Sequence, residues 1–192
     1  MSEQSIPWRG TLVVSGDTDA DELINTNPLA LLIGMLLDQQ VPLEWAFAAP
    51  QRLAQRLGGN LEATQIAELN PQFLEAAAVE KPAIHRFPAM MARRIHKMCE
   101  YLVDEYGGDP AAVWIAETDA AVVYERLLAL PGFGPNKAQI FLTILVKRFD
   151  QQLPGWESIV GEYATEDLRS VADLGDPDAL RRLREKRRNQ KR

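Results

Sequence analysis

The chain has 192 residues, of which 46% are hydrophobic and 25% charged, a composition typical of a folded domain and not of a disordered or fibrous protein. Its longest uninterrupted apolar stretch, residues 29–37, is far shorter than the ~20 residues of a membrane-spanning helix, and the N-terminus shows no charged-then-apolar leader. The single cysteine, Cys99, excludes an internal disulfide and a four-cysteine zinc or iron–sulfur site. We therefore expect a cytoplasmic protein with no membrane partner.

The charge is unevenly distributed along the chain, although its net value is only −6. The last twelve residues, 181–192, hold eight Lys/Arg and one acid, which leaves 13 basic and 26 acidic residues, a net −13, over 1–180. We interpret 1–180 as a single helical unit and 181–192 as a basic C-terminal tail. The tail is either a solvated, frayed helix end or an arm that contacts phosphates.

Helix signals follow one another along almost the whole chain. Residues 15–19, SGDTD, form a capping sequence for a first helix, and Asn27-Pro28 precede a second, LALLIGMLLDQQ, over 29–40. The second helix is apolar on nearly every face and is therefore expected to be central and buried. Further helices are predicted over 42–49 and 51–57 (bent at Pro50), 61–69, 71–78, 89–106 after a loop at 80–88, on both sides of 130–134, and within about 153–187. With no β-hairpin signal, no repeat and at most an extended piece at 11–14, the pattern predicts an all-α fold.

Residues 128–141, LALPGFGPNKAQIF, place a rigid turn between two predicted helices. Gly132 and Gly134 permit backbone angles that side chains forbid and leave their amides uncovered. Pro135 is tolerated in the first turn of a helix, so the following helix begins with free N–H groups at the positive end of its dipole. The turn therefore predicts an anion site suited to a phosphate, or else a tight connection without a ligand.

The pattern Leu-Pro-Gly-Phe-Gly-x-x-x-Ala resembles the helix–hairpin–helix motif of the DNA glycosylase superfamily that includes endonuclease III. The run LLIGMLLDQQ resembles the buried helix of that family, which ends in a glutamine near the lesion, at the position of Gln40. The resemblance covers about 25–160, and PLALLIGMLLDQQVP, PAIHRFPAMMARR, LPGFG and PGW are similar to a bacterial branch of these proteins. It implies two helical lobes with a cleft between them and a helix–hairpin–helix at about 120–148.

The resemblance also implies a set of DNA contacts. In the family the hairpin amides bind a DNA phosphate without reading sequence, often with a monovalent cation held by the hairpin carbonyls. Transferred to this chain, the DNA-binding residues are Gln39, Gln40, Arg86, Gly132, Phe133, Gly134, Asn136 and Lys137, with Lys137 either a phosphate contact or a surface charge. A base pocket would include His85, Phe87 and Trp156, although His85 and Phe87 could equally pack the loop and Trp156 could be core.

Cleavage of an N-glycosidic bond requires a carboxylate near the developing oxocarbenium ion and extrusion of the target nucleotide. The family places an aspartate after the hairpin in a Val-Asp context, but this chain reads KRFDQQLPGWESIVGEY there. Glu157 lies nearest the expected place and Asp150 is the next candidate, and either could be an ordinary solvated acid. Asp38, between a very apolar helix and two glutamines, is either a functional carboxylate or the polar end of the helix.

Family members that also cleave the backbone carry a lysine two residues after the second hairpin glycine, where this chain has Asn136. Lys137 follows, but one residue turns a helix by ~100°, so it should face elsewhere. We therefore expect no lyase activity, no iron–sulfur cluster and no other metal, because His85 and His96 are isolated.

The sequence thus favours a monofunctional DNA N-glycosylase that removes a damaged or mispaired base in base excision repair. It would be a monomeric hydrolase acting on duplex DNA and associated with the bacterial nucleoid. Two alternatives remain open: a non-catalytic DNA-binding module on a glycosylase frame, and an acidic helical protein whose basic tail docks on an acidic partner.

Overall fold

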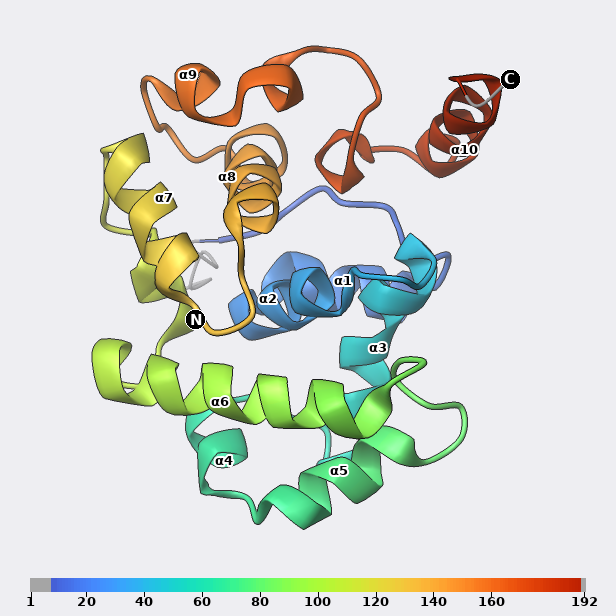
Figure 1. Cartoon of the computed structure of the whole chain (residues 1–192), viewed down its shortest axis with the longest axis vertical. Coiled ribbons are helices and arrows are strands. Elements are labelled where there is room, and N and C mark those ends of the chain that lie inside the picture. The colour runs from blue at the N-terminus through green and yellow to red at the C-terminus, as the bar shows by residue number, and fades with distance from the viewer. Residues whose placement is uncertain (1–7, 191–192) are drawn as a thin grey trace, which may run out of the picture.

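The computed structural model describes residues 8–190, and within this range it contains helices and no strand, which confirms the predicted all-α fold (Figure 1). Residues 1–7 of the predicted 1–180 unit, and Lys191 and Arg192 of the predicted tail, lie outside the described residues. The elements are α1 (Thr18–Thr26), α2 (Pro28–Leu37), α3 (Leu43–Arg56), α4 (Ala63–Glu68), α5 (Pro71–Val79), α6 (Pro88–Tyr106), η1 (Pro110–Val113), α7 (Ala120–Ala129), α8 (Pro135–Phe149), α9 (Trp156–Val160), η2 (Gly161–Ala164), η3 (Val171–Asp173) and α10 (Ala179–Gln190).

Polar caps and prolines set many of the helix starts, as the sequence predicted. Asp17 accepts hydrogen bonds from the amides of Asp19 and Ala20 at α1, and Asn27 accepts from Ala30 at α2. These side chains satisfy amide donors that have no partner within the helix. Three boundaries differ from the prediction. Helix α3 continues through Pro50 as a single helix where two were predicted, α2 ends at Leu37 and not at Gln40, and α4 begins at Ala63 and not at Leu61.

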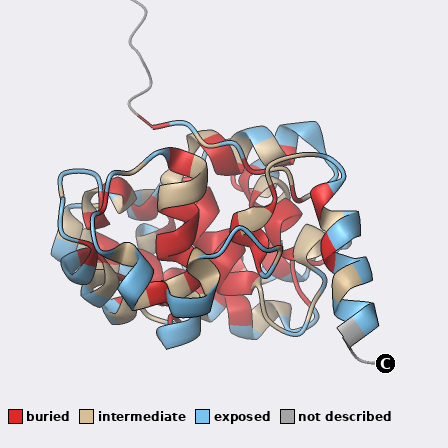
Figure 2. Ribbon diagram, turned by 90° about the horizontal axis from the view of Figure 1, so that it is seen from above, coloured by how far each residue is buried: buried red, intermediate tan, exposed pale blue. Residues whose placement is uncertain are grey.

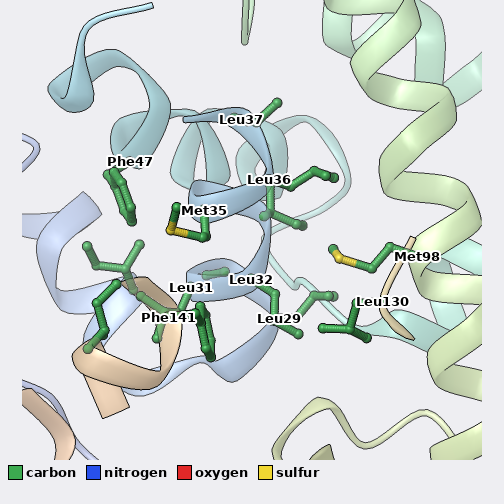
Figure 3. Packing of buried hydrophobic residues seen from close by; sticks show 14 of the residues in the cluster. Leu29, Leu31, Leu32, Met35, Leu36, Leu37, Phe47, Met98, Leu130 and Phe141 are labelled. Carbon is green, nitrogen blue, oxygen red and sulfur yellow. The ribbon is translucent and has the colours of Figure 1, made fainter. Parts of the chain in front are cut away.

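Helix α2 is the centre of the core. Every residue from Leu29 to Leu37 is buried, and Figure 3 shows these side chains packed among those of Phe47, Met98, Leu130 and Phe141. A Cβ on Gly34 would lie 2.7 Å from the Phe47 ring, so α2 and α3 approach closely at this point. Figure 2 shows the buried residues collected in the interior beneath exposed outer helix faces.

The helices form two groups that meet around α2. In the first group α1, α2 and α3 pack together, and α6 lies across α4 and α5 (Figure 1). In the second, α8 contacts α7, α9, η2 and η3. The groups are joined by contacts of α2 with α8 and η1, and by the extended segment 8–14. In that segment the Trp8 ring stacks on Phe149 at 4.2 Å, and the Thr11 amide donates to the Arg148 carbonyl at 3.1 Å.

The predicted basic tail is helical and folds back on the protein. Leu183 of α10 is buried, and its charged neighbours pair with carboxylates elsewhere on the chain. Arg184 pairs with Glu44 of α3, and Lys186 lies 3.5 Å from Asp167. Much of the positive charge of α10 is therefore balanced by the acidic body itself.

Candidate nucleic-acid interface

The turn between α7 and α8 is a tight hairpin packed on α2. The Phe133 amide donates to the Leu130 carbonyl at 3.0 Å, and both side chains are buried. Gly132 has φ +89°, and a Cβ there would lie 2.4 Å from Leu36 Cδ1. Gly132 is therefore required by the contact between the hairpin and α2.

Gly134 has a different environment from Gly132. It is the N-cap of α8 with extended angles, φ −118° and ψ 178°, and nothing lies within 4 Å of the place where its Cβ would be. No side chain caps α8, and among the described residues the amides of Gly134, Asn136 and Lys137 have no hydrogen-bond acceptor. The fold itself thus does not need glycine here, whereas a ligand that approaches the backbone closely would.

Lys137 points inward, contrary to the prediction of a surface charge or phosphate contact. Its Nζ donates to the carbonyls of Met35 at 2.7 Å and Leu36 at 2.6 Å, at the C-terminal end of α2. Burial lowers the pKa of this amine to about 8, against the opposing effect of Asp38. Its position one residue after Asn136 explains the direction, because the helix turns Lys137 toward α2.

Asp38 is the C-cap of α2 and lies half-buried beside this lysine. Burial raises the pKa of its carboxyl group, while Lys137 and then Arg187 of α10 act to lower it. A partly desolvated carboxylate beside a cation, at the meeting point of the two helix groups, is the kind of group that active sites use.

Both the side chain and the backbone carbonyl of Gln39 are hydrogen-bonded to other residues. Its side-chain Nε2 donates to the Leu36 carbonyl at 3.0 Å, and the Arg94 guanidinium donates to its side-chain Oε1 at 3.3 Å. The Phe87 backbone N–H donates a hydrogen bond to Nδ1 of His85, so the imidazole proton of His85 is on Nε2. This Nε2–H donates a hydrogen bond to the Gln39 carbonyl at 2.9 Å. His85 is buried, and burial lowers its pKa. Its ring borders the pocket between α3 and segment 80–88, and its hydrogen bond to Gln39 positions the turn.

Gln40, unlike Gln39, has a side chain that is not bound to the rest of the described protein. It is exposed, has a left-handed backbone with φ +57°, and its side chain makes no hydrogen bond among the described residues. A non-glycine residue in this conformation costs about 1–3 kcal/mol and persists only where the surrounding structure enforces it. Gln39 anchored by His85, and Pro42 downstream, supply that constraint.

An exposed apolar and basic strip begins beside this turn. Phe87 is 41% exposed with the Arg86 guanidinium 4.7 Å from its ring centroid, and Met90 is 38% exposed. Arg94 and Lys97 continue the strip along α6 at helical spacing, and neither forms an ion pair within the described chain. The sequence predicted Arg86 and Phe87 here, but not that Arg94 would reach Gln39.

The remaining predicted residues lie on α8 and at the start of α9. Asp150 is the C-cap of α8, about 22 Å along the helix from the hairpin, and is bonded to Gln152 at 3.1 Å. Glu157 is exposed on α9, and Trp156 packs against the core from the same short helix. This helix lies against the N-terminal part of α8, where Gln139 Nε2 donates to the Ile159 carbonyl at 2.9 Å. Asn136 instead receives a hydrogen bond from the Tyr163 hydroxyl at 2.6 Å, a partner that the sequence did not indicate.

A family model described as "HhH-GPD superfamily base excision DNA repair protein" matches residues 33–192. The chain belongs to the HhH-GPD superfamily. The matched region contains the Asp38–Gln40 turn and the hairpin. As a member of this superfamily, the chain is a DNA-binding protein of the base excision repair type. No curated protein matches the HhH-GPD chain described here. Between residues 8 and 190, no helix has the length and apolar character needed to cross a membrane.

Proposed function

We propose that this HhH-GPD protein is a monofunctional DNA N-glycosylase that removes a damaged or mispaired base from duplex DNA. The observation that carries the proposal is the meeting of a desolvated carboxylate, Asp38, with the hairpin and an exposed glutamine on one small area. Asp38 is favoured over Asp150, which lies at the opposite end of α8 from the hairpin, and over Glu157, which is exposed on α9.

DNA would be held by its backbone on both sides of Gln40. The uncovered amides of Gly134 and Asn136 suit one phosphate at the N-terminus of α8. Arg94 and Lys97 suit phosphates along α6. Gln40, with its free side chain, is placed to enter the base stack when the target nucleotide turns out, while Gln39 fixes the turn from which it projects.

In the chemical step, the bond between C1′ of the sugar and the base nitrogen breaks as water adds to C1′. The electron pair leaves with the base, which takes up a proton, and the sugar passes through an oxocarbenium-like state. The Asp38 carboxylate would stabilise this cation and accept the proton of the attacking water. Its raised pKa suits it to a proton transfer near neutral pH better than an exposed aspartate would be.

Lys137 supports the absence of lyase activity in this proposal. Schiff-base formation needs a free amine at the sugar, but Nζ of Lys137 is committed to two α2 carbonyls. We therefore expect an intact abasic strand as the product. A monovalent cation bound by the hairpin carbonyls remains part of the proposal, and the chain has too few cysteines for an iron–sulfur cluster.

Duplex oligonucleotides that each carry one damaged or mispaired base test the proposal. Free base should be released from at least one of them, and the strand should break only after alkali or heat. Nicking before alkali would contradict the monofunctional assignment.

A non-catalytic DNA-binding role is the second candidate, because Lys137 and Arg187 both act on the Asp38 carboxyl group and could hold it as a structural ion. In that case the protein would bind duplex DNA in a salt-sensitive manner, and no lesion in the panel would lose its base.

A further inference from the structure

A pocket lies beside the interface, between α3 and the segment 80–88. It has a volume of about 430 Å³, and its lining includes Arg52, Lys81 and Arg86 together with the ring of Trp45 and two prolines. No carboxylate lines it, whereas Glu44 and Glu80 line the larger cavity that adjoins it at Arg52 and Lys81. This is unusual in a body where residues 1–180 carry a net charge of −13.

The three cations are available to a ligand. Within residues 8–190, none of Arg52, Lys81 and Arg86 forms an ion pair with a carboxylate. Arg56, which lies nearby, has a different role. It donates to the carbonyls of Ala77 and Pro82 at 2.7 and 2.8 Å and lies 3.8 Å from Glu80.

The pocket wall is fixed by hydrogen bonds from several directions. Arg56 holds the segment at Pro82, and the Trp45 indole N–H donates to the Ala83 carbonyl at 3.0 Å. The Ile84 amide donates to the Ala78 carbonyl at 3.1 Å, and His85 bonds to Gln39. A wall held at four successive residues is preorganised, so a ligand would lose little by ordering it.

We propose that this pocket binds a nucleoside monophosphate group, with the phosphate on Arg52, Lys81 and Arg86 and the base against Trp45. Three cations around one site match the double charge of a phosphate monoester better than the single charge of a backbone diester. The pocket volume lies in the range of small-ligand sites, and an aromatic ring with proline walls suits a planar base. The site is separate from the hairpin and does not depend on glycosylase activity.

The phosphate monoester could come from a free mononucleotide or from the 5′-phosphate end of a DNA strand. Calorimetric titrations at about 0.15 M salt compare dAMP with a short single strand that carries a 5′-phosphate. Deoxyadenosine, 2-deoxyribose 5-phosphate and the same strand with a 5′-hydroxyl are the matched ligands that lack one recognition element. We expect dAMP or the phosphorylated strand to bind at least about tenfold more tightly than its counterpart without phosphate, and whichever binds more tightly identifies the source.

The variants Arg52→Gln and Lys81→Gln should each weaken this binding about tenfold, because each removes a charge-assisted hydrogen bond. Arg9→Gln is the matched control, since Arg9 pairs with Glu22 and lies outside the pocket lining. Neither pocket variant should change base release from duplex DNA. The proposal is overturned if phosphate adds nothing to affinity, or if both pocket variants bind as Arg9→Gln does. Equal affinity for dAMP and 2-deoxyribose 5-phosphate would contradict stacking on Trp45.

Discussion

Gln39 and Gln40 are identical in type and adjacent in sequence, yet their surroundings assign them different tasks. The side chain of Gln39 is bonded to Leu36 and Arg94, so its removal would loosen the turn. Gln40 is exposed and held with φ +57°, so its removal would relieve the backbone. The sequence named both residues without distinguishing them, because the difference depends on α6 and segment 80–88, which are distant in the chain.

The variant Gln40→Gly separates stability from function. Glycine adopts a left-handed backbone without strain, so the free energy of unfolding in urea should rise by about 1 kcal/mol or stay constant. Base release should fall, because the side chain proposed to enter the base stack is gone. A variant that loses stability, or that releases base at the wild-type rate, would contradict the role given to Gln40.

The buried amine of Lys137 predicts a specific pH dependence of stability. The folded-state pKa of about 8 lies below the ordinary value of 10.5, so between these values the unfolded chain binds more protons than the folded one. Stability should therefore rise with pH from about 8 to 10.5, by on the order of 3 kcal/mol relative to a variant without the amine.

Urea unfolding of the wild type and of Lys137→Met across this range measures that difference, since other titrating groups contribute equally to both proteins. A constant difference between the two proteins from pH 7 to 10.5 would show that Lys137 is not desolvated in the folded state.

Among the helices, the contact between the hairpin and α2 brings the residues of the candidate site together. Local signals in the sequence predicted α2, the turn and α8, because caps, prolines, glycines and apolar periodicity act over a few residues. They could not predict that Lys137 reaches Met35 and Leu36, because that contact spans about a hundred positions. The same limit explains why the sequence predicted Asp150 as a catalytic candidate, although it lies at the opposite end of α8 from the hairpin.

Two glycines of the hairpin form a matched pair for testing its function. Gly132→Ala should destabilise the protein by about 2–4 kcal/mol, because it combines a positive φ with overlap against Leu36. Gly134→Ala should leave stability unchanged or slightly higher, yet weaken duplex DNA binding about tenfold by blocking the approach of a phosphate. Thermal unfolding and fluorescence anisotropy measure the two effects. Unaltered DNA affinity in Gly134→Ala would remove the hairpin amides from the interface.

At the scale of the whole molecule, the arrangement of charge matters more than its sum. The sequence showed an acidic body and a basic tail, but it left open whether the tail contacts DNA phosphates or is solvated. In the structure the cations of α10 pair largely with the protein itself, as Arg184 does with Glu44 and Lys186 with Asp167. The unpaired cations of the body, including Arg94 and Lys97, are the better candidates for phosphate contacts.

Two double variants of equal charge change compare these surfaces. Arg94→Gln with Lys97→Gln should weaken duplex binding about tenfold and reduce the slope of log affinity against log salt by about 1–2. Arg184→Gln with Lys186→Gln should change the affinity less than about threefold, because these cations are already neutralised. Anisotropy titrations at several salt concentrations provide both values. The reverse order of effects would make the tail the DNA-contacting arm.

In the proposed function, Asp38 performs the chemical step on DNA held by the hairpin. Single-turnover release of free base from a duplex that the wild type cleaves should be followed for Asp38→Asn, with Glu157→Gln and Asp150→Asn as matched controls. We expect Asp38→Asn to bind the duplex normally but to release base at least about a hundredfold more slowly, while both controls retain the wild-type rate. Wild-type release by Asp38→Asn, or loss of release in Glu157→Gln with binding intact, would contradict it.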